Sequence, residues 1–319
     1  WANSASMITG RSAVGHGSAT QTAGLVFGGY SDPNYLANTE EYNGIGFTAS
    51  SALPAQRGWI MGAGTQTAAI GIGGFYPGST THTTVYNYNG TSWSTNPHSL
   101  PSAVAEGGSA GTQTAAIIFA GRPPDPHSSN SYEYDGSSWT AGGSLGTARR
   151  LPGGGGTQTS CRASGGVTNP PTTYTSNSEE YNGTSWSEGN NLNTAKQQLP
   201  GAGTQTAAIT STGYDGTNVL AETEEYNGTS WSEVTDNPTG RIQASIAGSQ
   251  TAALSAFGAT NTPGGTLSSA TQTYDGTNWT NESGTVNTAR RLLGMVGSQT
   301  SAIAAGGLAS PGATANAES

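Results

Sequence analysis

The chain has 319 residues, of which 9% are charged, and its net charge at pH 7 is −9. An acidic surface repels phosphate backbones, which argues against nucleic-acid binding. No apolar stretch approaches the ~20 residues of a transmembrane helix. The composition therefore predicts a partner that is neither a nucleic acid nor a membrane. Thirteen Tyr and seven Trp recur at intervals, which is untypical of a disordered polar chain and indicates a folded one.

Two motifs repeat along the chain. A tripeptide Thr/Ser-Gln-Thr recurs at seven positions spaced 45–49 residues apart, and a second motif, Tyr-Asn/Asp-Gly-x-x-Trp, lies between these copies. A period of ~45–50 residues built from short β segments is typical of propeller blades. The tripeptides are centred on Gln21, Gln66, Gln113, Gln158, Gln205, Gln250 and Gln299, and the second motif spans 88–93, 134–139, 181–186, 226–231 and 274–279, with a degenerate copy at 42–47.

Each repeat predicts four strands. The first is rich in Gly and Ala, which suits the crowded inner edge of a blade, and the second is an apolar run that ends in glycine. No stretch has a sustained period of 3.6 residues, so almost no helix is expected. The first strand follows a basic residue at Arg11, Arg57, Arg149, Lys196, Arg241 and Arg290, and the second ends at Gly29, Gly74, Gly121, Gly166, Gly213, Gly258 and Gly307.

The third strand ends at the motif Tyr, and the fourth begins at the Trp, which is expected to pack between neighbouring blades. The intervening Asn-Gly or Asp-Gly is predicted to supply the two positive-φ residues of a type I′ hairpin. The repeated glutamines are expected to form a ring on one face and to satisfy backbone groups at a tight turn.

These features predict an all-β fold, a single seven-bladed β-propeller of four-stranded antiparallel blades. The last repeat stops before its own Tyr-Asn-Gly-Trp motif, whereas the chain begins at Trp1, where a fourth strand should begin. An N-terminal strand from Trp1 to about Ser4 is therefore expected to complete the last blade and remove the open edge. The predicted blades cover residues 5–50, 51–97, 98–143, 144–190, 191–236, 237–283, and 284–319 together with 1–4.

A basic residue, a strand ending in Gly-Gly, and a nearby Tyr and Trp resemble the kelch repeat, and the likeness covers essentially the whole chain. The third repeat departs from it, with Ala103-Val104 in place of the basic residue. The Gly-Thr-Gln-Thr and Tyr-Asn-Gly-Thr-Ser-Trp segments are also similar to kelch-type proteins predicted from marine bacteriophage genomes. The double glycine is complete at 28–29, 73–74, 165–166 and 306–307, and is altered to Ala120-Gly121, Thr212-Gly213 and Phe257-Gly258.

Enzyme chemistry finds little support in the sequence. Some kelch propellers are copper oxidases that use a Cys–Tyr cross-link, but Cys161 occupies a strand position that is Gly or Ala in the other repeats. The Ser-x-Asp-x-Gly-x-x-Trp box of sialidases is not matched. A glycosidase needs paired carboxylates, and Glu106 is the main acidic candidate near an inner strand. We therefore expect no enzyme activity and no cofactor.

Histidines in predicted loops raise the alternative of a metal site. His82, His98 and His127, with Asp125, belong to loops that emerge on one face, and their types suit a transition metal. Solvated loop histidines explain the same pattern, and no metal is predicted.

The loops between strands two and three vary, whereas the rest of each repeat is nearly a copy. Variation on one face of a rigid scaffold is typical of a recognition surface. Aromatic rings can stack on sugars while Asp and Asn bond hydroxyls. The candidate ligand-binding residues are Tyr30, Asp32, Tyr35, Phe75, Tyr76, His82, Arg122, Asp125, His127, Tyr174, Tyr214 and Asp215.

The sequence thus favours a non-enzymatic recognition module that binds a surface glycan or a protein receptor. Such a module is expected outside the cell or on a virion, where other virion or surface proteins could be further partners. A purely structural or decoration protein of a virion or cell surface is the first alternative, and a glycoside-active enzyme is the second.

Overall fold

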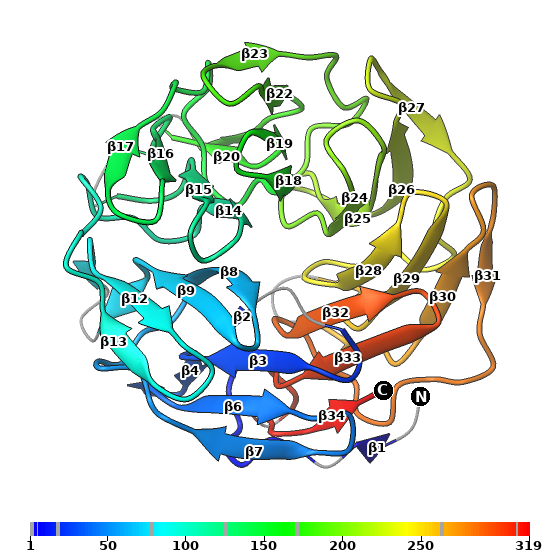
Figure 1. Cartoon of the computed structure of the whole chain (residues 1–319). Helices are drawn as coiled ribbons and strands as arrows, with labels where there is room; N and C mark the ends of the chain where they lie inside the picture. The colour runs from blue at the N-terminus through cyan, green and yellow to red at the C-terminus, as the bar shows by residue number, and fades with distance from the viewer. Residues whose placement is uncertain are drawn as a thin grey trace.

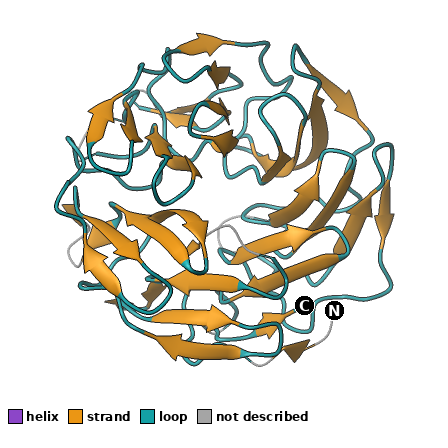
Figure 2. Cartoon of the chain, in the orientation of Figure 1, coloured by secondary structure: helices purple, strands orange, loops and turns teal. Residues whose placement is uncertain are grey.

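The structure is a computed structural model that describes residues 3–4, 6–16, 20–76, 80–123, 127–169, 172–261, 265–310 and 312–319. Within these ranges the chain forms strands and turns, and it contains no helix. Seven antiparallel sheets of four strands surround a central axis, as Figures 1 and 2 show. The fold is therefore the predicted seven-bladed β-propeller. Because the described residues hold no helix, they also offer none that could cross a membrane.

The first four blades follow one another in sequence, and each runs from an inner strand to an outer one. They are β2 (Gly15–His16), β3 (Gly24–Phe27), β6 (Thr39–Tyr42) and β7 (Phe47–Ser50); β8 (Met61–Thr65), β9 (Ala68–Ile72), β12 (Val85–Tyr88) and β13 (Trp93–Thr95); β14 (Gly108–Gly111), β15 (Ala116–Phe119), β16 (Ser131–Tyr134) and β17 (Trp139–Ala141); and β18 (Gly153–Thr157), β19 (Ser160–Ser164), β22 (Ser178–Tyr181) and β23 (Trp186–Glu188).

The last three blades complete the circle in the same order. They are β24 (Gly201–Gly203), β25 (Ala208–Tyr214), β26 (Val219–Tyr226) and β27 (Trp231–Val234); β28 (Ser245–Ser249), β29 (Ala252–Ala256), β30 (Thr271–Tyr274) and β31 (Trp279–Asn281); and β32 (Gly294–Ser298), β33 (Ser301–Ala305), β34 (Ala317–Glu318) and β1 (Asn3–Ser4).

Closure of the ring depends on the two ends of the chain. Strand β1 pairs antiparallel with β34, with Asn3 opposite Glu318 and Ser4 opposite Ala317. The first described residues thus form the outer strand of blade seven, and β1 and β34 lie side by side in Figure 1. The predicted closure by an N-terminal strand is confirmed, although Trp1 itself lies outside the described residues.

The repeated basic residue is buried and pairs with a residue of the third strand of its own blade. Arg11 contacts Glu40 at 2.9 Å, and Arg149 contacts Glu179 at 2.7 Å. Each Glu also accepts backbone N–H bonds from the preceding inter-blade loop, for example from Ile8 to Glu40. Buried charges persist where they are paired and hydrogen-bonded. The remaining pairs of this type are Lys196 with Glu224 and Arg290 with Glu318.

Where the third-strand Glu is replaced, the basic residue contacts a side chain of another kind. Arg241 bonds the amide of Gln272, and the Arg57 guanidinium lies 5.6 Å from the ring centre of Tyr86. In the third blade, which lacks the basic residue, Val104 and Tyr132 belong to one buried apolar cluster. In the third repeat, two members of one buried apolar cluster thus stand at the positions that hold an ion pair in other blades.

Adjacent blades are joined by the motif Trp and the repeated Gln. The indole N–H of Trp93 donates to Thr39 Oγ1 of the preceding blade at 2.8 Å, as predicted for a residue between blades. The Gln66 side-chain amide donates to the carbonyls of Gly24 and Tyr42, also in the preceding blade, at 3.1 and 2.9 Å. The glutamines thus join blades, which corrects the expectation that they serve their own turn.

The hairpin between strands three and four also differs from the prediction. Tyr88 pairs with Trp93, so four residues form the loop. Gly90 has φ = 88°, whereas Asn89 is not among the positive-φ residues. The Asn89 side chain instead accepts N–H bonds from Thr91 and Ser92 at 3.0 and 2.8 Å. This Asx-type turn replaces the type I′ turn because the side-chain oxygen supplies the bond that closes the loop.

Candidate functional site

Seven equivalent residues at the start of the inner strands adopt a left-handed backbone conformation, although none is glycine. Each lies two positions after the repeated basic position, and their φ angles run from 47° to 56°. Such conformations cost of order 1 kcal/mol each and cluster at functional sites. We call this set the mouth ring; it consists of Ala13, Trp59, Glu106, Leu151, Gln198, Gln243 and Leu292.

Backbone bonds link the mouth ring from blade to blade. Trp59 N donates to Ala13 O at 3.0 Å, Ala13 N donates to Leu292 O at 3.2 Å, and Leu151 N donates to Glu106 O at 2.9 Å. These inter-blade bonds stabilise the left-handed turns. Because the backbone is fixed in this way, the side chains are free to differ, and all seven are half-buried.

The mouth ring surrounds the entrance to the central channel. Two adjoining cavities lie there, of about 310 and 410 Å³, and both are lined by Trp59, Glu106, Leu151 and Gln198. Every member of the mouth ring lines at least one of them. Cavities of ~300–1,000 Å³ are typical of small-ligand sites. The inner-strand residue His16 also lines the first cavity.

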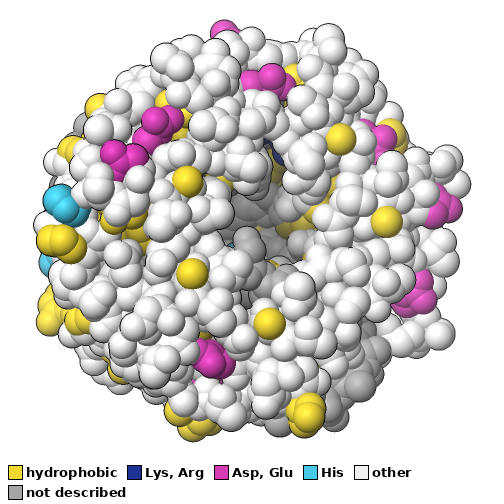
Figure 3. Space-filling model, in the orientation of Figure 1, with side chains coloured by type: hydrophobic (Ala, Val, Ile, Leu, Met, Phe, Trp, Pro, Cys, Tyr) yellow, Lys and Arg dark blue, Asp and Glu magenta, His cyan; other side chains and the backbone are white. Residues whose placement is uncertain are grey.

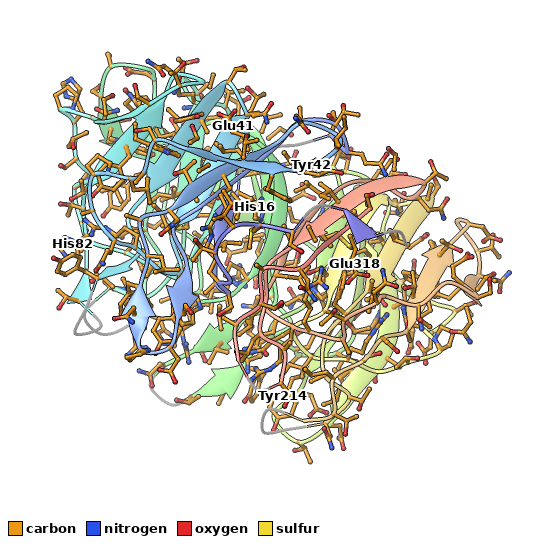
Figure 4. All side chains as sticks on the ribbon, turned by 90° about the horizontal axis from the view of Figure 1, so that it is seen from below. His16, Glu41, Tyr42, His82, Tyr214 and Glu318 are labelled. Carbon is orange, nitrogen blue, oxygen red and sulfur yellow. The ribbon has the colours of Figure 1, made fainter. Side chains whose placement is uncertain are left out.

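The predicted variable loops adjoin this entrance. The residue just before each mouth-ring residue forms a β-bridge with the start of the loop between strands two and three, for example Gly58 with Phe75 and Arg150 with Val167. Figure 4 shows Tyr214 toward the lower end of the molecule, Glu41 and Tyr42 toward the upper end, and His82 at the left between them. We call the end with these loops the binding face, because the loops and the channel entrance together form one surface.

Three of the loops form small hairpins that raise aromatic side chains beside the entrance. Tyr30 and Tyr35 pair across the first hairpin with ring centres 5.2 Å apart, and Tyr30 lies 6.0 Å from the Trp59 ring. Tyr30 also donates its hydroxyl to Asp32 at 2.8 Å. The hairpins are β4 (Tyr30–Ser31) with β5 (Asn34–Tyr35), β10 (Phe75–Tyr76) with β11 (Thr80–Thr81), and β20 (Val167–Thr168) with β21 (Thr173–Tyr174).

These rings continue into the second blade. Phe75 packs edge-on against Trp59 at 6.0 Å, and the guanidinium of Arg122 lies 5.7 Å from its ring centre. Phe75 is 5% exposed, so its ring packs against Trp59 and leaves little of its own surface open to solvent. Tyr35, Tyr30, Trp59 and Phe75 thus form one continuous row, here called the aromatic arc, from the loop edge to the channel entrance.

Two smaller groups of candidate residues flank the arc. Tyr76, 41% exposed, packs against His82 at 5.5 Å. Tyr174 and Tyr214 pack edge-on at 5.7 Å, from neighbouring blades. Asp215 accepts N–H bonds within its own turn.

Histidines and the cysteine show no metal chemistry within the described residues. His127 Nδ1 contacts Val167 O at 3.0 Å, and burial lowers its pKa. No group of His, Cys, Asp and Glu in the described ranges could hold a metal ion, and Asp125 lies outside them. Cys161 is buried, and burial raises the pKa of its thiol to about 12, as suits a strand residue in a packed core.

Two arginines bond charged and amide side chains of the mouth ring. Glu106 and Arg150, from blades three and four, form an ion pair of 2.7 Å. Arg291 donates to the side-chain oxygen of Gln243. Of these, sequence reasoning identified only Glu106. The missed signal is positional: the second residue after the basic position differs among repeats that are otherwise similar.

The opposite surface has a different character. Figure 3 shows a face with scattered Asp and Glu, very few visible Lys or Arg, and a hollow at its centre where the blades meet. Together with the hairpins and cavities of the binding face, this makes the two ends of the channel chemically distinct.

This geometry defines the protein as a seven-bladed β-propeller with a lined channel entrance. Among solved structures, the chain is similar to that of YjhT, with a TM-score of 0.65 and 12% sequence identity. The similarity covers 88% of this chain and 99% of that one. At this identity the likeness shows the fold alone. No protein-family model and no curated protein matches the sequence.

Proposed function

We propose that this chain is a non-enzymatic recognition module that binds glycans through its binding face. The observation that carries the proposal is the aromatic arc, which leads to a cavity lined by carboxylate and amide side chains. Flat aromatic rings beside polar groups suit sugars, because sugar C–H faces stack on the rings while hydroxyls need hydrogen bonds. Because the cavity is largely preformed, ligand binding requires little ordering of the protein and so costs little conformational entropy.

The carboxylates support binding rather than hydrolysis. Glycoside hydrolases of the usual kind need two carboxyl groups, one on either side of the scissile bond. Among the described residues that line the two entrance cavities, Glu106 is the one carboxylate, and it is paired with Arg150.

The setting that we propose for this module is a virion or another extracellular surface. The repeat likeness to kelch-type proteins, including those predicted from marine bacteriophages, supports it. So does the polar composition, with 49 Gly and few charges.

A glycan array probed with the whole chain tests the proposal. Trp59→Ala and Tyr30→Ala are expected to weaken binding of every captured glycan about tenfold or more, since stacked rings contribute most to such sites. Ile45→Ala is the matched control, because Ile45 is 82% exposed in a hairpin between strands three and four. Undiminished binding by the Trp59 variant, with an unchanged melting temperature, would refute the proposal.

A further inference from the structure

Basic side chains that reach solvent gather on one face. The chain has ten Lys and Arg, all within the described residues. The three that are not buried, Arg122, Arg150 and Arg291, all lie at β-bridges that join the inter-blade segments to the loops of the binding face. In a chain of net charge −9, every cation that is not buried thus lies on the face that carries the channel entrance. The seven buried ones are Arg11, Arg57, Arg149, Arg162, Lys196, Arg241 and Arg290.

Arg291 is partly desolvated without a carboxylate beside it. Burial lowers its pKa, and no neighbouring charge opposes that shift. Within the described residues its side chain forms no ion pair, and its bond is to the neutral amide of Gln243. Four of the buried cations at the repeated basic position, by contrast, have a Glu partner. A cation that loses water without gaining a counter-ion is costly, and an anionic ligand would offset that cost.

Arg150 lies on the cavity wall and has a side-chain N–H group without a partner among the described residues. Its Nη1 donates to Glu106, while its Nε is buried and has no partner among the described residues. The side-chain oxygen of Gln198 is likewise buried and unpartnered there. Arg150, Gln198 and Gln243 line the same cavity of about 410 Å³, and Trp59 forms part of its wall. The cavity wall therefore combines one guanidinium, amides and one aromatic ring, and Arg291 bonds the wall residue Gln243.

We propose that the channel entrance binds the anionic group of an acidic sugar, a carboxylate or a sulfate, with Arg150 and Arg291 as its ligands. The inference rests on the proposed glycan binding and names its ligand class. The sugar ring stacks on Trp59, and Gln198 and Gln243 bond its hydroxyls. Charge-assisted bonds from guanidinium to an oxyanion are roughly twice as strong as neutral ones. This ligand class follows from the two guanidinium groups at the entrance, since the one on Arg291 has a neutral amide rather than a carboxylate as its partner among the described residues.

Calorimetry with matched probes tests this. Oligogalacturonate carries carboxylates, its methyl ester is the same sugar without charge, and a sulfated galactan oligosaccharide carries sulfate. We expect at least one charged probe to bind about tenfold more tightly than the ester. Arg291→Gln and Arg150→Gln should each remove about that advantage, while Arg291→Lys keeps part of it. Unchanged melting temperatures establish that the variants fold.

The outcomes separate the two proposals. Preference for a charged probe that is lost in Arg291→Gln supports the inference, and comparison of the two charged probes identifies carboxylate or sulfate as the group. Equal binding of ester and acid, or array hits confined to neutral glycans, overturns the inference and leaves glycan recognition standing. Absence of binding to any glycan overturns both.

Discussion

Glu106 and Arg150 form an ion pair across the boundary between blades three and four, with 2.7 Å between Oε2 and Nη1. The Arg side chain is 26% exposed and the Glu side chain 11%. The pair lies on the wall of the channel entrance, so the carboxylate occupies part of the guanidinium that an anionic ligand would use. Glu106 thus competes with such a ligand for Arg150.

Glu106→Gln is expected to bind oligogalacturonate several-fold more tightly than the original chain. The change preserves size and removes the negative charge that competes for Arg150. Calorimetric titration measures the difference, and Glu188→Gln, an exposed change on an outer strand, is the control for net charge. Weaker binding by Glu106→Gln alone would show that the carboxylate contacts the ligand itself.

Arg149→Val is expected to lower the free energy of unfolding by about 3–5 kcal/mol, because it leaves Glu179 buried without its cation. The double variant Arg149→Val with Glu179→Tyr introduces the residues that blade three has at these positions, Val104 and Tyr132, which belong to one buried apolar cluster. It should recover most of that loss. Urea unfolding of the single and double variants gives the coupling energy, and a loss equal to the sum of both single changes would contradict the paired-position account.

Gln66→Ala is expected to cost about 2 kcal/mol of unfolding free energy, because it removes two bonds to the preceding blade and leaves the carbonyls of Gly24 and Tyr42 with fewer donors. Gln250→Ala is the comparison. Its amide donates to Tyr226 O at 2.8 Å, one bond instead of two, so a smaller loss is expected. Equal losses at the two positions would mean that the inter-blade bonds do not set the cost.

Stability should fall at alkaline pH through tyrosines that join blades. Burial and a hydrogen bond to Glu41 raise the pKa of Tyr88 to about 12, and burial and Glu180 do the same for Tyr226. An unfolded Tyr titrates near pH ~10. Since the folded pKa is raised, this stabilisation is complete below pH ~10 and is lost as the pH rises from about 10 to 12.

Urea unfolding across that pH range measures the loss. The double variant Tyr88→Phe with Tyr226→Phe should show a shallower decline above pH ~10, because its rings cannot ionise. An equally steep decline in the double variant would assign the alkaline transition to other groups.

Much of the fold followed from local chemistry. Three features were predictable: the inter-blade Trp93, the glycine ends of the second strands and the closing N-terminal strand. Each follows from a pattern that recurs in the repeats along the chain. The Asn89 turn was not, because Asn-Gly suits both a two-residue and a longer loop, and strand register decides between them. Gln66 was assigned to its own turn because its partners, Gly24 and Tyr42, lie in another blade.

The candidate site also has a part that the sequence predicted and a part that it did not. The variable hairpins with Tyr30 and Tyr35 were visible in the sequence as loops of differing content. Trp59 was not singled out, since it follows Gly58 in a segment that carries no motif. Only the closed ring brings it beside Tyr30 and Phe75.

The sequence by itself determined the number of blades, their strand order and the way in which the ends meet, because each is a matter of local pattern repeated along the chain. The tertiary structure decided which side chains face the channel together. Glu106 and Arg150 are separated by nearly a whole repeat and belong to different blades. Their contact arises from the close packing of adjacent blades around a common axis, and no period in the sequence specifies that distance.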